Sequence, residues 1–219
     1  MPTEPISNAA LLTLAQWFSP SFPVGAFSYS HGLEWAVQVG DVQDATDFQA
    51  WLTAVLRHGA GRNDVILLAE AYRAATQNEL LEIDALARAL SPSSERLLET
   101  SQQGAAFART VSDIWQVDLP DLPYPVAVGA AASALDVPLA QTAQMFLHAF
   151  ASNLTSAAIR LIPLGQTQGQ ECLNTMAECI NQTVTMAIGQ TLDDLGSTAF
   201  AIDIASMCHE TQYSRMFRS

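Results

Sequence analysis

Apolar residues recur along this chain with the three-to-four-residue spacing of an amphipathic α-helix. No segment keeps the strict apolar–polar alternation of a half-buried strand. Alanine, the strongest helix former, occurs 35 times. Residues 1–219 are therefore predicted to form one all-α, single globular domain of about ten helices. We expect helices over residues 8–18, up to 39, 46–57, 63–76, 78–90, 94–117, from 125, 138–162, 167–188 and 200–207.

Polar residues in front of the apolar runs mark the expected helix starts. Thr46 and Gln49 have the spacing of a capping box, and Asn63 and Asn78 are predicted to cap the next two helices. Within the helix at 94–117, the large apolar side chains are expected to face the core: Leu97, Leu98, Phe107, Val111 and Ile114.

The balance of apolar and charged residues constrains the partners. Apolar residues make up 49% of the chain and charged residues only 14%, so a large core is available and the surface is thinly charged. We therefore expect partners to cover part of the surface, and a homodimer with an apolar interface. The net charge is 9 − 22 = −13. An acidic surface repels phosphate backbones and anionic lipids, which argues against nucleic acid or a membrane as a partner.

The chain contains no lysine, and its nine basic residues are all arginine. This excludes a P-loop ending in Gly-Lys-Ser/Thr, a Schiff-base lysine and the lysine of a protein kinase. We expect the isolated chain neither to bind nor to hydrolyse GTP.

Cysteine usage and the N-terminal residues point to the cytoplasm. The three cysteines are an odd number without a C-x-x-C pair, which fits a reducing compartment. The first ten residues, MPTEPISNAA, lack the basic region and apolar core of a signal peptide. The uncharged run at 137–159 includes glutamine, histidine and asparagine, so it is predicted to be a buried helix and not a membrane span.

The stretch SPSFPVGAFSYSHGLE, residues 19–34 (the opening segment), has the composition of an active-site loop. Ser28, His31 and Glu34 could be imagined as a catalytic triad. Their spacing instead places them on consecutive helical turns, and no G-x-S-x-G elbow is present. The segment is therefore predicted not to be catalytic.

The other residues of the opening segment suggest a shaped surface. Pro23 and Gly25 are predicted to set a tight turn, and Ser28 and Ser30 to cap a helix. Three aromatic residues are unusual in a solvated loop and are expected to pack, either internally or against a partner: Phe22, Phe27 and Tyr29.

A tightly bound metal is not expected. Cys172 and Cys179 are seven residues apart, which on a helix separates them by about 10 Å. Cys208 and His209 are adjacent and point about 100° apart. The cysteines are predicted to be buried small side chains. Any metal bound by the isolated chain should be weakly held or held at an interface.

Two further features point to interfaces. Arg160 lies in an apolar turn before a proline, where it either organises helix ends or an interface, or is a helix-terminal arginine favoured by the dipole. The C-terminal tail (residues 209–219) is rich in side chains typical of interface cores: Tyr213, Arg215, Met216, Phe217 and Arg218. We expect it to be flexible in the free protein and to dock on a scaffold partner; the alternative is that it caps its own helices.

Four blocks resemble the UreF family of urease accessory proteins, in the family's order: SPSFPVGAFSYSHGLEWAV, GAAFART, SAAIRLIPLGQTQGQ and HETQYSRMFRS. Ala26 departs from the usual glycine, and Cys208 from a basic residue. The resemblance implies an all-helical, non-enzymatic homodimer that helps deliver nickel to apo-urease. Its partners would be the scaffold UreD (also called UreH) and the nickel-binding GTPase UreG, with nickel present only transiently. The hypothesised partner-binding residues are Phe22, Pro23, Gly25, Phe27, Tyr29, His31, Glu34, Arg160, Tyr213, Arg215, Phe217 and Arg218.

The resemblance leaves rival functions open. The leading hypothesis is an assembly factor that bridges the scaffold and the GTPase. The alternatives are a GTPase-activating protein that inserts an arginine or glutamate into the partner's site, a metallochaperone that carries nickel directly, and an unrelated α-helical enzyme.

Overall fold

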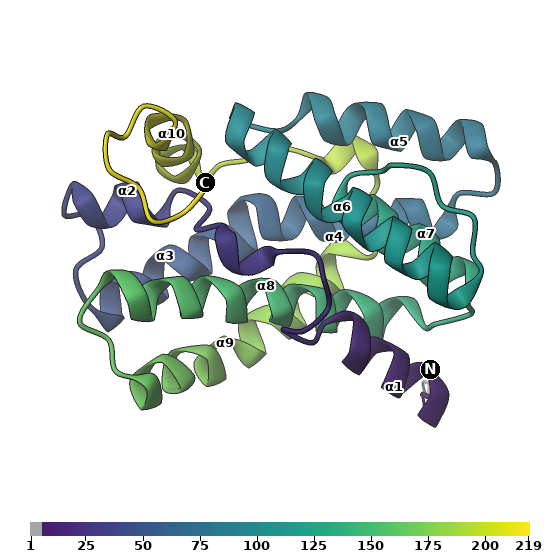
Figure 1. Cartoon of the computed structure of the whole chain (residues 1–219), viewed down its shortest axis with the longest axis horizontal. Coiled ribbons are helices and arrows are strands. Elements are labelled where there is room, and N and C mark those ends of the chain that lie inside the picture. The colour runs from purple at the N-terminus through teal and green to yellow at the C-terminus, as the bar shows by residue number, and fades with distance from the viewer. Residues whose placement is uncertain (1–5) are drawn as a thin grey trace.

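A computed structural model describes residues 6–219 of the chain, which form ten α-helices, two short 3₁₀ turns and no strand (Figure 1). The all-α prediction is confirmed. The elements are α1 (Asn8–Trp17), η1 (Ala26–Ser28), α2 (Leu33–Gln38), α3 (Ala45–His58), α4 (Ala60–Arg73), α5 (Gln77–Ala89), α6 (Ser94–Trp115), α7 (Tyr124–Ala134), α8 (Leu139–Leu161), α9 (Gln166–Ala187), η2 (Leu192–Asp194) and α10 (Phe200–His209).

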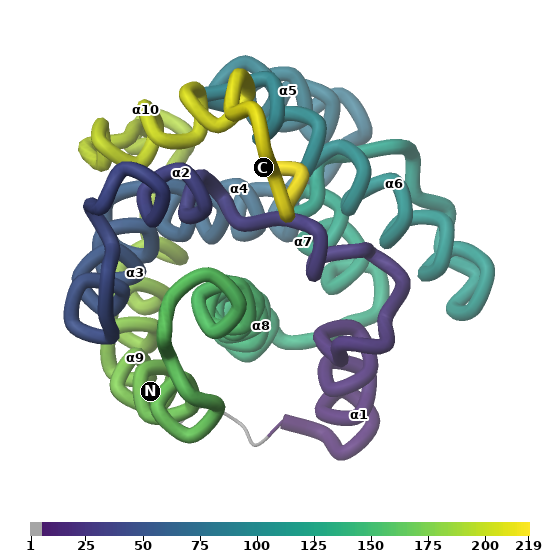
Figure 2. The backbone as a smooth tube through the Cα atoms, turned by 60° about the vertical axis from the view of Figure 1, so that its left-hand side comes forward, coloured from purple at the N-terminus to yellow at the C-terminus, as the bar shows by residue number. Residues whose placement is uncertain are grey.

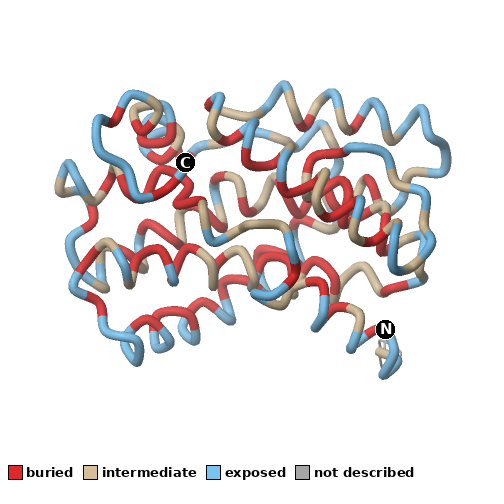
Figure 3. The backbone as a smooth tube through the Cα atoms, viewed as in Figure 1, coloured by how far each residue is buried: buried red, intermediate tan, exposed pale blue. Residues whose placement is uncertain are grey.

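Helix α8 lies at the centre of the molecule. Figure 2 shows it nearly end-on, with α9, α3, α2, α7 and α1 around it, and it packs against each of these helices. Small residues such as Ala143, Ala151 and Ala158 are fully buried along it, so neighbouring helices approach closely. Figure 3 shows that buried residues face the interior while α5, on the outside, is mostly exposed.

The closest backbone contacts in the molecule occur at two glycines. A Cβ atom on Gly104 of α6 would lie 1.9 Å from the carbonyl oxygen of Leu122, in the connection to α7. A Cβ atom on Gly129 of α7 would lie 2.2 Å from the carbonyl oxygen of Leu68 on α4. Both distances are far inside van der Waals contact, so α4, α6 and α7 pack backbone against backbone.

Three predicted helix starts are wrong by a few residues. Helix α3 is capped by Asp44, whose carboxylate accepts from the backbone N–H of Thr46 and Asp47. Helix α5 begins with a capping box between Thr76 and Glu79. In both places a second good cap lies within two residues of the predicted one, and the sequence alone does not rank them.

The start of α4 was misplaced for a different reason. The chain turns at Gly59 and re-enters a helix at once, so Asn63 lies inside α4. Its side-chain oxygen accepts from the N–H of Gly196 instead of capping a helix.

The predicted inner face of α6 is partly wrong. Phe107 and Val111 are buried as expected, but Leu97, Leu98 and Ile114 are 36–56% exposed. The buried face carries polar and small residues in their place: Arg96, Glu99, Thr100, Gln103, Gly104 and Ala108. No helix within residues 6–219 is both long enough and apolar enough to cross a membrane.

Candidate partner-binding site

The opening segment reverses direction through residues with left-handed backbone. Gly25 has φ 72°, as the predicted turn requires, and His31 and Gly32 follow with φ 58° and 79°. A Cβ atom on Gly32 would lie 2.7 Å from the backbone nitrogen of Ser206, so α10 sits directly on this turn. Gly32, and not Ser28 or Ser30, is the N-cap of α2.

Glu34 joins α2 to the C-terminal tail. Its carboxylate is buried and accepts from the backbone N–H of Met216 at 2.7 Å and of Phe217 at 2.9 Å. The imidazole Nε2 of His209 lies 3.3 Å from the same carboxylate. One side chain thus satisfies two backbone donors and meets a histidine about 180 residues away in the sequence.

His209 is held from both sides. Its Nδ1 lies 2.6 Å from the carboxylate of Glu95, which in turn pairs with Arg215 at 2.5 Å. Both ring nitrogens are therefore occupied by carboxylates, and the ring is fully buried. His209 is not available to bind a metal together with Cys208.

The rest of the tail is packed on its own chain. The N–H of Arg218 donates to the carbonyl of Ser28 at 2.8 Å, and the N–H of Ser30 donates to the carbonyl of Ser219 at 2.6 Å. The ring of Phe217 is buried beneath the guanidinium of Arg160, 4.5 Å from its centre.

The expectation of a flexible free tail is therefore wrong, and the alternative that it caps its own helices describes the structure. This packing could not be predicted from the sequence, because the tail is anchored by one ring and by backbone N–H groups and therefore shows no apolar stripe. Arg160 is an exposed helix-terminal arginine that also covers the tail.

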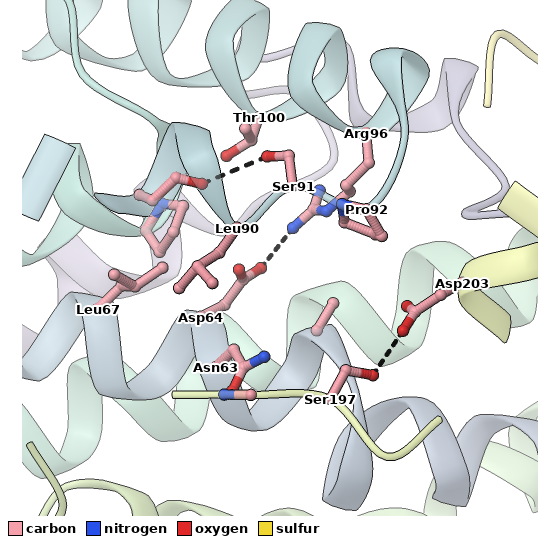
Figure 4. Close-up of a pocket in the computed structure, with 14 residues that line it drawn as sticks. Asn63, Asp64, Leu67, Leu90, Ser91, Pro92, Arg96, Thr100, Ser197 and Asp203 are labelled. Atoms are coloured by element: carbon pink, nitrogen blue, oxygen red, sulfur yellow. Dashed lines mark hydrogen bonds and ion pairs between the residues drawn. The ribbon is translucent and has the colours of Figure 1, made fainter. Parts of the chain in front are cut away.

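A buried ion cluster supports this end of the molecule. Arg96 pairs with Asp64 at 2.6 Å (Figure 4). It also pairs with Glu99 at 3.3 Å. Burial raises the pKa of the Asp64 carboxyl above its usual value, although Arg96 opposes this. For Arg96, burial lowers the pKa, but the two carboxylates outweigh it and the pKa is raised. Glu99 also accepts from the hydroxyl of Ser219, so the cluster reaches the tail.

His31 is buried beside this cluster. Its ring lies edge-on to Phe150 at 5.5 Å, and burial, together with the positive charge of Arg96, lowers its pKa to about 3. The imidazole is therefore neutral at neutral pH. It is a core residue and not a general base.

The sequence of this chain is similar to those of known proteins. A family model described as UreF matches residues 42–177. Proteins called "Urease accessory protein UreF" are similar over nearly the whole length. The one from Ruegeria pomeroyi is 54% identical, covering 100% of this chain and 99% of its own. Those from Roseobacter denitrificans (98% and 96% covered) and a Cereibacter sphaeroides strain (97% and 100%) are 51% identical.

The chain belongs to the UreF family.

In this UreF-family chain the twelve hypothesised partner-binding residues divide into two groups. Five are buried and hold the fold together: Phe22, Tyr29, His31, Glu34 and Phe217. The others reach or line the surface: Pro23, Gly25, Phe27, Arg160, Tyr213, Arg215 and Arg218. Backbone hydrogen bonds of Ser28 and Ser30 join the opening segment to the tail, and the two segments run side by side in Figure 1.

Two exposed members of this set are aromatic. Phe27 is 71% exposed, and Tyr213 is fully exposed at the apex of the tail. Met216, which was noted in the tail, is 55% exposed although its N–H is bound to Glu34. Phe27, Tyr213 and Met216 are termed the apolar rim.

Sequence analysis missed the residues that support this site. Glu95 and Glu99 of α6 receive His209, Arg215 and Ser219, but they lie in no motif. For Glu95 the available signal was its position in the first turn of α6, where the dipole favours carboxylates; Glu99 lies beyond that turn.

Two of the three cysteines are buried as predicted, whereas Cys208 is half-buried. Cys172 and Cys179 are buried, and their sulfur atoms accept from the side chains of Gln49 and Arg57. Within residues 6–219, no three histidine, cysteine, aspartate or glutamate residues are arranged to hold a metal ion.

Proposed function

We propose that this chain acts in urease maturation as a non-catalytic assembly factor that bridges the scaffold UreD (UreH) and the GTPase UreG in the cytoplasm. Membership of the UreF family supports the role in maturation. Nickel then passes to apo-urease through the assembled complex, and this chain holds no nickel tightly.

The observation that carries the bridging role is the apolar rim. Tyr213 is fully exposed between two anchors, the His209 contacts before it and the Glu34 contacts after it. Because the backbone on both sides of Tyr213 is anchored, little backbone conformational entropy is lost when this exposed aromatic side chain binds, which favours its use as an interface anchor.

A homodimer belongs to the same proposal. Phe200, Ile204 and Met207 lie at helical spacing on α10 and are 47–67% exposed. This apolar stripe is separate from the apolar rim and is a candidate dimer surface. Sedimentation should show a dimer for the natural chain and a monomer for Ile204→Asp; an unchanged dimer would place the interface elsewhere.

The bridging role is tested by co-purification with the scaffold and the GTPase, followed by mass measurement. Tyr213→Ala should weaken complex formation by about 1–3 kcal/mol, as interface anchors typically do. Its thermal midpoint should be unchanged, since the side chain touches no core. Leu81→Ala, at an exposed leucine on the distant α5, is the matched control and should bind normally. Full binding by Tyr213→Ala together with Met216→Ala would contradict the role of the apolar rim.

A further inference from the structure

A second surface lies beside the tail and is separate from the apolar rim. It is a groove of about 440 Å³ between the opening segment, α6 and Arg218. Its α6 wall presents Gln102 and Arg109, two turns apart on one face of the helix, and its opposite wall is formed by Pro23 and Tyr29. This volume falls within the range of about 300–1,000 Å³ usual for binding pockets.

The groove is rich in hydrogen-bond donors and contains no acid. None of its lining residues is Asp or Glu, although the chain has 22 acidic residues and a net charge of −13. Within residues 6–219, Arg109 has neither a carboxylate partner nor a hydrogen-bond acceptor. Arg218 reaches only the amide oxygen of Gln102, at 3.4 Å. That oxygen already accepts from the Tyr29 hydroxyl at 2.8 Å.

The backbones that carry the two guanidiniums are held in place. Arg218 is fixed by its backbone N–H, which donates to the carbonyl of Ser28. Arg109 projects from the middle of the 22-residue helix α6. Burial raises the pKa of Tyr29, so its hydroxyl stays protonated. Within residues 6–219, neither of these exposed guanidiniums has a carboxylate partner, so the pair is suited to an external carboxylate, which each can bind through its forked donors.

We propose that this groove binds an acidic peptide segment of a partner protein, with an Asp or Glu carboxylate between Arg109 and Arg218. The apolar wall at Pro23 and Val24, and the exposed Phe27 nearby in sequence, favour a segment with an apolar side chain next to its acid. The charge of −13 on the whole chain repels polyanions, which disfavours nucleic acid. The inference rests on the proposed function only in that a maturation partner would supply the segment.

The groove can be tested without any partner. The probe is the peptide Ac-Gly-Phe-Glu-Glu-Gly-NH2, titrated into the ¹⁵N-labelled full chain while the Nε–Hε signals of the arginines are recorded. We expect saturable shifts of the Arg109 and Arg218 signals, and none with Ac-Gly-Phe-Gln-Gln-Gly-NH2. Because a hydrogen bond between charged groups is strong, Arg109→Gln should weaken peptide binding about tenfold. Arg73→Gln, which changes the net charge equally on α4, should not.

Charge reversal gives a second, independent readout. The Arg109→Glu, Arg218→Glu double variant should bind Ac-Gly-Phe-Arg-Arg-Gly-NH2 and lose the acidic peptide. Since Arg218 is anchored through its backbone, the double variant should keep its helical content. If it does not, Arg109→Glu alone serves the same comparison.

The outcomes separate the possible ligands and the two proposals. Shifts of both arginines with inorganic phosphate but not with the acidic peptide would overturn the inference in favour of a small-anion site. Absence of shifts with either probe would also overturn it. Peptide binding together with failed co-purification would contradict only the proposed bridging role. Intact co-purification without peptide binding would contradict only the groove.

Discussion

The α4–α6–α7 region and the tail end of the molecule are held together in opposite ways. In the first region, backbones meet directly at Gly104 and Gly129, and the buried Arg96–Asp64 pair also joins α6 to α4. At the tail end, the contacts are hydrogen bonds and ion pairs around Glu34, His209 and Glu95, with the ring of Phe217 as an apolar anchor.

The two kinds of contact differ in how they can change. Close-packed backbones cannot shift without losing contact along a whole helix, because interiors are packed like crystals. Hydrogen bonds and ion pairs are separate contacts, so each can instead be exchanged for water or for a partner's groups without disturbing a whole helix. The close-packed region is therefore the fixed frame, and the tail end is where binding can be accommodated.

The largest expected effect is in the close-packed region. Gly104→Ala should lower the free energy of unfolding by about 3–5 kcal/mol, because the new Cβ meets the rigid backbone of residues 122–124. Urea denaturation measures it. Gly165→Ala is the control: no atom lies within 4 Å of its Cβ, so stability should stay within about 0.5 kcal/mol. Equal losses of stability for the two variants would show that the close backbone contact at Gly104 is not the cause of the effect.

The next effect is at the tail end. Glu34→Ala leaves the N–H groups of Met216 and Phe217 without an acceptor and should cost about 3 kcal/mol of unfolding free energy. Glu34→Gln keeps one acceptor oxygen and should cost less. Hydrogen exchange would show the loss at its source: the amides of residues 216 and 217 should exchange faster while α7 stays protected. Unchanged protection of both amides would show that other contacts hold the tail.

A third effect depends on pH, at His31. The unfolded chain binds a proton below the ordinary pKa of 6.5, whereas the folded chain does so only near 3. Stability from this residue is complete above about pH 6.5 and is lost as the pH falls from there towards 3. Between about pH 7 and about pH 5 the loss should be about 2 kcal/mol.

The variant His31→Asn isolates this effect, since asparagine tolerates the left-handed backbone and does not titrate. Asp64 has a raised pKa, which favours the folded state as the pH falls. Because both proteins contain Asp64, its contribution cancels when their pH profiles are compared. Parallel pH profiles for the two proteins would contradict the buried neutral histidine.

The smallest effect is at the edge of the tail. Arg160→Ala removes the cation above the Phe217 ring and should cost about 0.5–1 kcal/mol, because the guanidinium is exposed. A double-mutant cycle with Phe217→Leu measures the coupling. No coupling would make Arg160 a helix-terminal residue without a role at the tail.

Helical spacing and turn chemistry predicted the class of fold and most of its elements. The Gly25 turn and the buried cysteines could be predicted because each depends on its own few residues. Cap positions were less certain, since Asp44 and Thr46 are both good caps and the choice between them depends on packing.

The candidate site was predicted only in part. Blocks at the two ends of the sequence carried the family resemblance, and the structure brings them together. Which of their residues are buried could not be predicted, because it depends on pairs such as Glu34 with Phe217 and Glu95 with His209. These pairs are far apart in sequence, and neither partner has an apolar pattern that reveals the contact.

The pairing of Glu34 with the backbone of residues 216 and 217 has a consequence for how the protein is made. On the ribosome, Glu34 leaves the exit tunnel long before its hydrogen-bond donors are synthesised. Until then its carboxylate can accept hydrogen bonds only from water, and α2 cannot pack against α10. Bringing together segments this far apart also carries a large loop-closure entropy. The surface proposed to meet partners is thus the last to form, so a nascent or truncated chain does not present it in finished form.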